Sequence, residues 1–430
     1  MIKIKATTET IESKGGLLLA GKIAIKAGLG NIKSAAMKKA GTIITSLFGL
    51  MVEGKSDFES MGEKRGSLFF KEALFLEFVY AKETVRLYLE QMAKDVDGII
   101  GQLRECAVNI IKKVPLSGHW IKGMYYIPVD IDGTAMDNSG TKKEGVSRTY
   151  CGFEGYHPVM AYVGREGYII DCELNPGSQH SQKGMVPFIT GVISRLRKIE
   201  PNGRFLFRLD SGNDAWDTLE AITSDSGCYC IIKRNKRRES EEKWLKRAKR
   251  HGKRTEPRKG KKVWVGRTRI HPYMEGMYCV YEVIERKIDS SGNRFLIPEI
   301  EVNSWWTNLR CDAEEVILLY HDHATSEQFH SELKHDLGVE RLASGKLAVN
   351  KILLAVAMNA YNSLRLLGQS SIERKFWEKQ KRKRLGKVIR DIICVAGKLV
   401  KHAGELIFKI NEKEPMLPVF LRLYAVLDEP

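Results

Sequence analysis

Two short apolar runs, each rich in β-forming residues, end at an aspartate. Residues 125–137 read YYIPVDIDGTAMD, and their apolar run closes at Asp132 before a Gly-Thr pair. Residues 203–222, GRFLFRLDSGNDAWDTLEAI, repeat this arrangement with Asp210, a Ser-Gly turn and a helical pattern. Each run predicts a buried strand that ends in a turn, which is where α/β folds place their chemistry. A carboxylate in that position is costly unless it meets a metal, a cation or hydrogen-bond donors.

Asp130 is an alternative to Asp132, because at the period of two in a strand both lie on one face. An aspartate that caps the following turn through its side chain accounts for either residue, but less easily for both. After the second strand, Asp214 and Asp217 are more typical of residues that cap or flank a helix start.

The segments between and after these strands predict the remaining elements of an α/β fold. Residues 154–164 and 166–181 predict two further strands of a meander, residues 185–199 a helix, and residues 228–235 a fifth strand. His157 and His180 lie in the meander. They are candidates for hydrogen bonds near the aspartates, although a packed or turn histidine is the commoner case.

Residues 320–338, YHDHATSEQFHSELKHDLG, follow a helical period. At about 100° per residue, Tyr320, His323 and Lys334 lie within roughly 40° of the direction of Glu327, and the apolar residues fall on the far side. This pattern predicts an amphipathic helix with one carboxylate among groups that bind phosphate. An ordinary solvated helix explains the segment equally well when it is taken alone.

The pattern also divides the chain into regions. The pattern predicts that residues 1–115 are mostly helical, and a helix-turn-helix whose later helix starts near Lys82 is one arrangement that fits. Residues 116–345 hold the α/β region, which a basic, β-rich insertion interrupts at about 236–312. Residues 346–430 predict a helical region with a terminal hairpin.

Charge concentrates in the first part of the insertion. Residues 233–262 hold 16 Lys or Arg against 4 Glu, which leaves +12 of the chain's formal +17. A charge run is usually a solvated face, but cations this dense repel one another and are relieved chiefly by a polyanion, whose condensed counterions are then released. We expect a DNA-contacting strip that is disordered until bound. Its candidate contacts are Arg247, Lys249, Arg250, Lys253 and Arg254.

The remaining composition argues against several other classes. The eight cysteines form no C-x-x-C pair, so neither a zinc finger nor a disulfide framework is indicated. The longest apolar stretch, residues 43–52, is too short to span a bilayer. No sustained apolar region follows the N-terminal lysines, and no G-x-x-x-x-G-K-[ST] phosphate loop is present. These features predict a cytoplasmic enzyme that does not use ATP.

Three motifs in this order resemble the DDE insertion-sequence transposases. Asp132 stands in an Asp-Gly-Thr context, Asp210 precedes Ser-Gly, and residues 320–334 fit the family's Y-(2)-R-(3)-E-(6)-K spacing, with His323 in place of the arginine. Residues 13–29, 155–164 and 174–181 are also similar to the insertion-sequence 1380 group.

The resemblance implies a ribonuclease H-like core in which Asp132, Asp210 and Glu327 bind two divalent cations, Mg²⁺ with Mn²⁺ as a substitute. It assigns DNA contacts to Tyr320, His323 and Lys334. Trp305 and Trp306 are candidates for stacking on a flipped base, although core packing is the commoner role of such residues.

The resemblance further implies partners and a location. It predicts that residues 1–115 bind DNA and that the substrate is double-stranded DNA, both the terminal inverted repeats of an element and a target. A homodimer assembled on DNA and a place at the prokaryotic nucleoid, away from membranes, are also expected. Two alternatives stay open: a ribonuclease H-like nuclease without strand transfer, and a domesticated DNA-binding protein without catalysis.

Overall fold

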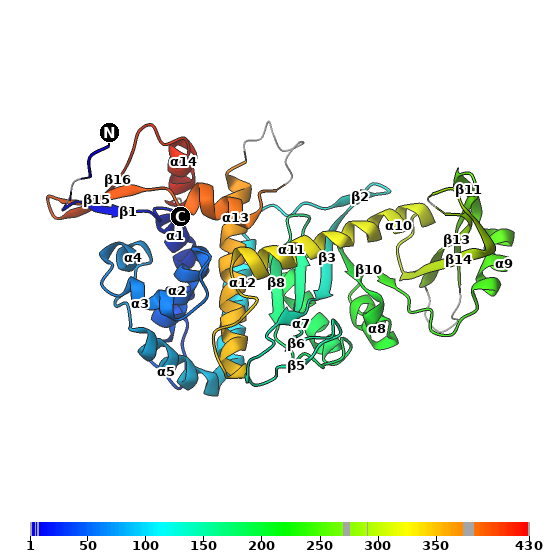
Figure 1. The fold of residues 1–430 in the computed structure, drawn as a ribbon, viewed down its shortest axis with the longest axis horizontal. Coiled ribbons are helices and arrows are strands. Elements are labelled where there is room, and N and C mark those ends of the chain that lie inside the picture. The colour runs from blue at the N-terminus through cyan, green and yellow to red at the C-terminus, as the bar shows by residue number, and fades with distance from the viewer. Residues whose placement is uncertain are drawn as a thin grey trace.

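A mixed β-sheet runs through the middle of the molecule (Figure 1). The computed structural model describes residues 2–4, 6, 8–269, 276–289, 291–372 and 382–428. Within these residues the sheet has ten strands, in the order β11-β12-β13-β14-β10-β9-β3-β7-β8, with β2 (His119–Ile121) paired to β3. The strands predicted from the apolar runs are β3 (Met124–Gly133), β7 (Val159–Val163), β8 (Tyr168–Glu173), β9 (Phe205–Leu209) and β10 (Cys228–Lys233).

Strand directions follow from the connections. β3, β7 and β8 are antiparallel neighbours, whereas β9 runs parallel to β3 and β10 runs parallel to β9. Parallel strands need long crossovers, which here contain α7 (Met185–Ile199) and α8 (Trp216–Thr223). The helix predicted over residues 185–199 is confirmed, and so are the five predicted strands. Between β3 and β7 lies a small sheet of β4 (Met136–Asp137), β5 (Ser147–Arg148) and β6 (Glu154–Tyr156).

Helices pack at the β8 end of the sheet. They are α1 (Leu17–Ala27), α2 (Ala40–Val52), α3 (Glu59–Lys64), α4 (Leu68–Ala73), α5 (Lys82–Met92) and α6 (Val96–Ile111). The predicted helical character of this segment is confirmed, including a helix that begins at Lys82. The long helix α12 (Leu347–Ser370) contacts α6, α2 and β8 and is buried over most of its length. Across the described residues, no helix combines the length and apolar character that a membrane crossing needs.

The two ends of the chain meet in a second small sheet. β1 (Thr10–Glu12) pairs with β15 (Gly397–His402), which pairs in turn with β16 (Glu405–Ile410). The pair β15–β16 is the predicted terminal hairpin, and α13 (Leu385–Val388) and α14 (Leu417–Asp428) flank it. The N-terminal helices share one hydrophobic core with α12 and the C-terminal segment. The two ends of the chain are therefore packed as a unit.

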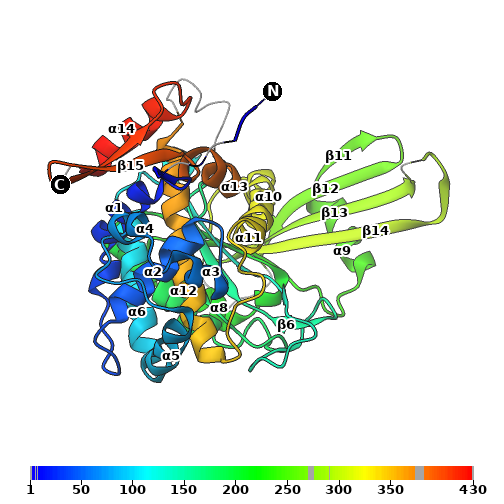
Figure 2. The ribbon, with the colours of Figure 1, turned by 60° about the vertical axis from the view of Figure 1, so that its left-hand side comes forward.

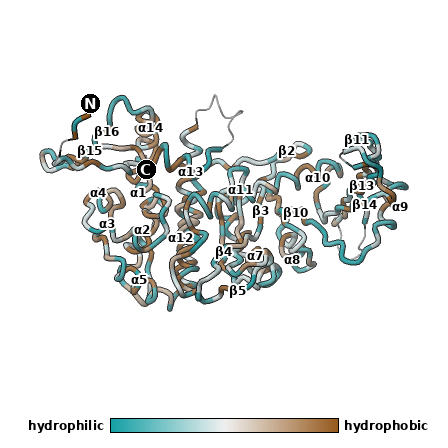
Figure 3. Tube along the Cα trace, viewed as in Figure 1, coloured by the Kyte–Doolittle hydropathy of each residue, from teal (hydrophilic) through white to brown (hydrophobic). Residues whose placement is uncertain are grey.

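The insertion continues the central sheet. It contains α9 (Glu241–His251), β11 (Lys253–Arg258), β12 (Lys261–Thr268), β13 (Tyr278–Ile288) and β14 (Arg294–Thr307). The predicted antiparallel strands are confirmed. Because β14 pairs with β10, the insertion strands extend the central sheet away from the N-terminal helices (Figure 2). Hydrophilic residues dominate its outer end around α9 and β11 (Figure 3).

The basic strip is ordered in this structure, contrary to the expectation of disorder. Residues 241–251 form α9, whose N-terminus is capped by the Ser240 hydroxyl accepting from the Lys243 amide. Trp244, Leu245 and Ala248 form a buried apolar stripe between the exposed cations of the helix. This stripe packs on β12, β13 and β14, and burial of an apolar face is what stabilises helices in proteins. The sequence contained this stripe, but the density of charge obscured it.

The segment predicted as one amphipathic helix is helical but irregular. It consists of α10 (Ala313–His321), a 3₁₀ turn (Asp322–Ala324), α11 (Thr325–Ser331) and a π-helical turn (Glu332–Asp336). The predicted apolar back is confirmed, since Phe329, Leu333 and Leu337 are buried. Because the rotation per residue changes at both irregular turns, the 100° spacing does not hold from residue 320 to residue 334.

Candidate active site

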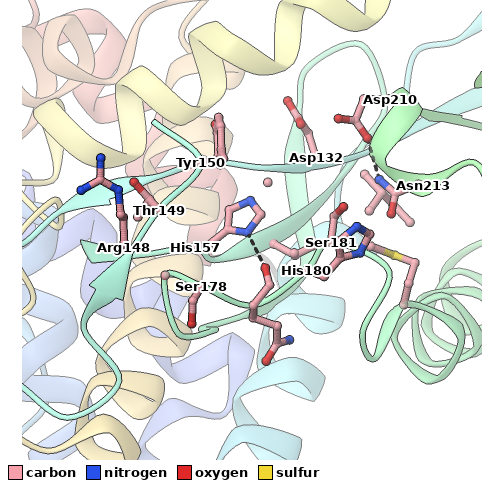
Figure 4. Close-up of a pocket in the computed structure, with 16 residues that line it drawn as sticks. Asp132, Arg148, Thr149, Tyr150, His157, Ser178, His180, Ser181, Asp210 and Asn213 are labelled. Atoms are coloured by element: carbon pink, nitrogen blue, oxygen red, sulfur yellow. Dashed lines mark hydrogen bonds between the residues drawn. The ribbon is translucent and has the colours of Figure 1, made fainter. Parts of the chain in front are cut away.

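Two aspartates meet at the ends of neighbouring parallel strands. Asp132 lies near the end of β3, and Asp210 directly follows β9. Ile131 on β3 is in register with Leu209 on β9, so the next residue of each strand is an aspartate. Asp132 and Asp210 line one cavity of about 630 Å³ (Figure 4). The structure thus brings together two of the three carboxylates singled out in the sequence.

The surroundings of the two aspartates differ. Burial raises the pKa of the Asp210 carboxyl, and the neighbouring Asp132 carboxylate raises this pKa further. Burial also raises the pKa of Asp132, but His330, His323 and Ser326 together lower it by more, so that its net shift is downward. The Ser326 hydroxyl donates to Asp132 at 2.8 Å, and the Asn213 amide donates to Asp210 at 2.8 Å.

The carboxylate pair has the chemistry of a divalent-cation site. Repulsion between Asp132 and Asp210 is relieved by a cation placed between them, and carboxylate oxygens are the ligands that Mg²⁺ prefers. Among the described residues, no group of three or more His, Cys, Asp or Glu side chains converges closely enough to hold a metal. The pair alone therefore fits part of a metal site.

Asp130, the alternative to Asp132, is part of a buried ion pair. It is 2% exposed, and the guanidinium of Arg208 donates two hydrogen bonds of 2.6 Å to its carboxylate. Nδ1 of His323 lies 2.9 Å from the same carboxylate. Burial raises the pKa of Asp130, but Arg208 and His323 lower it by more. With its charge already neutralised, Asp130 lacks the free oxygens that a metal ligand needs.

His323 is directed inward. The residue is 7% exposed, and its imidazole faces Asp130. Burial lowers the pKa of the imidazole, but Asp130 raises it by more, so that the net shift is upward. The ring is thus engaged with Asp130, and the DNA contact by His323 stays a prediction.

Glu327 is exposed and does not line the cavity of the two aspartates. It lines a second cavity, of about 450 Å³, together with Gln328, Ser331, Glu332, Arg382 and Arg384. On α11, the residues that face Asp132 are Ser326 and His330. The 3₁₀ turn before α11 shifts the rotational register of the helix, and the role of Glu327 as a third ligand stays a prediction.

Tyr320 and Lys334 flank the carboxylates. The Tyr320 ring packs between Trp305 at 5.6 Å and His323 at 5.7 Å. Burial and then the nearby aspartates, Asp210 first, raise the pKa of the Tyr320 hydroxyl above its usual range, so it stays protonated. Nζ of Lys334 donates at 2.9 Å to the carbonyl of Ala135, just beyond β3.

His330 is a site residue that the sequence analysis did not single out. Its Nε2 lies 3.2 Å from Asp132, and its Nδ1 lies 2.9 Å from the Tyr162 hydroxyl. Its position seven residues after His323 was the available signal, since residues seven apart share a helix face. The two histidines predicted in the meander, His157 and His180, both line the cavity. Nδ1 of His157 lies 3.4 Å from the carbonyl of Gln179.

The family model for the transposase DDE domain, group 1, matches residues 91–429. The chain belongs to this family of DDE transposases. No curated relative matches its sequence. Among solved structures, it is similar to the piggyBac transposase in a synaptic complex with hairpin DNA, at 10% identity and a TM-score of 0.43. That similarity covers 88% of this chain and 78% of the other.

In this transposase, Trp305 and Trp306 are core residues. They are 2% and 6% exposed. Trp306 donates its indole N–H to Asp214 at 2.9 Å and packs on Trp216 at 5.3 Å. Base stacking needs an open ring face, which neither buried ring offers here, and a DNA contact by either tryptophan stays a prediction.

The five basic residues singled out in the strip are exposed but differ in their partners. Lys249 pairs with Glu285 at 3.1 Å, Lys253 with Glu314 at 3.0 Å, and Arg254 with Glu256 at 2.8 Å. Arg247 and Arg250 instead line a basic cavity of about 520 Å³. Its lining is Lys243, Lys246, Arg247, Arg250, His251, Arg267, Thr268, Arg269 and Tyr281. Among the described residues, this wall holds seven basic side chains and no carboxylate.

Proposed function

We propose that this chain is a transposase of the insertion-sequence 1380 group that cleaves the ends of a DNA element and joins them to a target by strand transfer. The observation that carries the proposal is the meeting of Asp132 and Asp210 at the ends of β3 and β9. The family uses divalent metal ions, and Asp132, Asp210 and Glu327 would hold them, with Mg²⁺ as the natural ion and Mn²⁺ as a substitute. Bound metal ions would lower the pKa of a water or a DNA 3′ hydroxyl and stabilise the leaving oxygen.

Residues of this chain prepare the carboxylates for that role. Ser326 and His330 hold Asp132 in its ionised form, and Asn213 orients Asp210. The buried Asp130–Arg208 pair fixes β3 against β9 beside them. Tyr320, protonated at neutral pH, and Lys334 supply donors to the phosphate backbone next to the cut.

Glu327 is proposed as the third ligand on grounds of position. Ser326 precedes it in the chain and already contacts Asp132, so α11 carries the Glu327 backbone to the neighbourhood of the pair. The side chain lies in the cavity beside Arg382 and Arg384, and metal and DNA would draw it toward the aspartates.

A ribonuclease H-like core is proposed from the strand order. Three antiparallel strands, β8, β7 and β3, are followed by β9 and β10 in parallel, which is the arrangement expected of that fold. Strands β11 to β14 and helix α9 form the proposed insertion at about residues 236–312. The helices before residue 115 form the proposed DNA-end-binding domain.

Double-stranded DNA is the proposed partner. The basic cavity of α9 and β12 has cations and no carboxylate in its lining among the described residues, and phosphate neutralisation by such groups dominates affinity for DNA. Terminal inverted repeats and target DNA are the proposed substrates, bound by a homodimer in the prokaryotic cytoplasm.

The proposal is tested with purified protein, Mg²⁺ and labelled duplexes that carry the inverted repeats flanking the gene. Joined products support transposition. Hydrolysed products alone identify a nuclease without strand transfer, and a mobility shift without cleavage identifies a DNA-binding protein that has lost catalysis.

A further inference from the structure

The cavity beside the aspartates extends well beyond them and is lined by side chains that the cleavage chemistry does not use. We propose that this cavity binds a single unstacked nucleotide of the DNA strand adjacent to the scissile phosphate. Tyr150 stacks on the base, and Arg148 contacts the backbone phosphate. This inference rests on the proposed function, since it takes the carboxylate pair as the place of the cut.

The size and position of the cavity favour one nucleotide. At about 630 Å³ it lies within the roughly 300–1,000 Å³ typical of pockets for single small ligands, so a duplex cannot enter it. One wall is the carboxylate pair itself, and Tyr150 and His157 lie between Arg148 and Asp132 (Figure 4). A nucleotide whose phosphate meets the aspartates therefore extends its base toward Tyr150.

The lining has the chemistry of a base site. Tyr150 is 70% exposed, and its ring meets the His157 ring edge-on at 5.2 Å, which leaves ring surface open for stacking. Ile131, Val159 and Met185 supply apolar contacts. Arg148 is exposed at the outer side of the cavity.

Polar groups around these contacts offer hydrogen bonds to a base edge. Ser178, Gln179 and His180 also line the cavity. Hydroxyl, amide and imidazole groups can donate to and accept from the edge of a base.

Two glycines show that the walls are closely fitted. A Cβ on Gly133, directly after Asp132, would lie 2.5 Å from Nε2 of His157. A Cβ on Gly177 would lie 2.2 Å from the carbonyl oxygen of Ser147. The cavity is therefore formed in advance by close packing of its walls, which lowers the cost of ordering it on binding.

The test compares duplexes that carry either a normal or an abasic nucleotide next to the cleavage position. Base–aromatic stacking corresponds to roughly a 5- to 150-fold change in an equilibrium. For the unmodified protein, the abasic substitution should lower kcat/KM for cleavage by about tenfold or more. Tyr150→Ala should lower kcat/KM on normal DNA by a similar factor, and its kcat/KM should not change with the abasic substitution. Tyr150→Trp should restore both the rate and the sensitivity to the abasic substitution.

Trp120→Ala is the matched control. Trp120 is another exposed aromatic residue, at 72%, but it lies on β2 and outside the cavity. Its variant should cleave normal DNA at the unmodified rate and keep the full sensitivity to the abasic nucleotide. If Tyr150→Ala keeps that sensitivity, so that the two changes are additive, the inference is wrong.

A second measurement separates this inference from the proposed function. With 2-aminopurine at the same position, binding should change the fluorescence of the base, and Tyr150→Ala should remove that change. A protein that cleaves no DNA contradicts the proposed function while the fluorescence still tests the nucleotide site. Cleavage without any dependence of the fluorescence on Tyr150 contradicts the nucleotide site alone.

Discussion

Removing three cations from α9 should reduce the salt dependence of duplex binding far more than removing three from β11. The first variant combines Lys246→Gln, Arg247→Gln and Arg250→Gln, which removes three positive charges from the lining of the basic cavity. Glutamine has nearly the helix propensity of lysine and arginine, and all three side chains are exposed. The fold of the variant should therefore be unchanged, which thermal unfolding checks.

The matched variant removes the same charge from the same strip. It combines Lys253→Gln, Arg254→Gln and Arg258→Gln on β11. The first two cations pair with Glu314 and Glu256, and the third donates to the carbonyl of Asp289 at 2.8 Å. Cations engaged in this way are less available to phosphate.

The magnitude follows from counterion release. Each phosphate contact contributes about 0.9 to the slope of log affinity against log salt, so the α9 variant should lose about 2.7 of slope. Over the fourfold range from about 50 to 200 mM salt, the unmodified protein should lose roughly 40-fold more affinity than this variant. The β11 variant should lose less than about one contact, or 0.9 of slope. Fluorescence anisotropy of a labelled duplex measures all three slopes, and equal slopes for the two variants would contradict preferential phosphate binding by α9.

Three further predictions concern stability and its dependence on pH. Arg208→Met leaves Asp130 buried without its cation and should cost about 3–5 kcal/mol in urea unfolding; adding Asp130→Leu should recover much of this loss, and an unchanged stability in the single variant contradicts the ion-pair role. His119 has a pKa that burial and the nearby Arg208 lower to about 4, so the unfolded chain binds the proton first, and stability should fall as pH drops from about 6.5 toward 4. His119→Asn should remove at most about 3 kcal/mol of that fall, and an unaltered pH profile would show that the histidine is not responsible. Trp305→Ala should cost about 3–5 kcal/mol without changing the salt slope of DNA binding; full stability combined with weakened binding would instead restore its predicted contact with DNA.

The local parts of the fold could be predicted from the sequence. The runs that end at Asp132 and Asp210 form buried strands, because a short apolar run of β-forming residues is stable only when it is shielded from water. A turn follows each strand. The register that places the two carboxylates side by side required the sheet pairing of β3 with β9. The resemblance of the motifs supplied that pairing as an expectation.

The partners of buried polar groups could not be predicted. Nothing in the spacing of residues 320–334 indicated that His323 meets Asp130, because the two residues are 193 positions apart in the sequence. The position of Glu327 depends on the 3₁₀ turn that precedes α11. Such turns follow from tertiary packing and have no strong signature in the sequence.

The most direct test of the account is metal-dependent strand cleavage by Asp132→Asn and Asp210→Asn, with Asp217→Asn as the control. Asp217 is an exposed carboxylate on α8, the helix that follows β9 in the chain. Its variant therefore has the same change of charge outside the cavity. The account predicts that the first two variants bind duplex DNA as the unmodified protein does and cleave none of it in Mg²⁺, while Asp217→Asn cleaves normally. Cleavage at the unmodified rate by either Asp132→Asn or Asp210→Asn would contradict it.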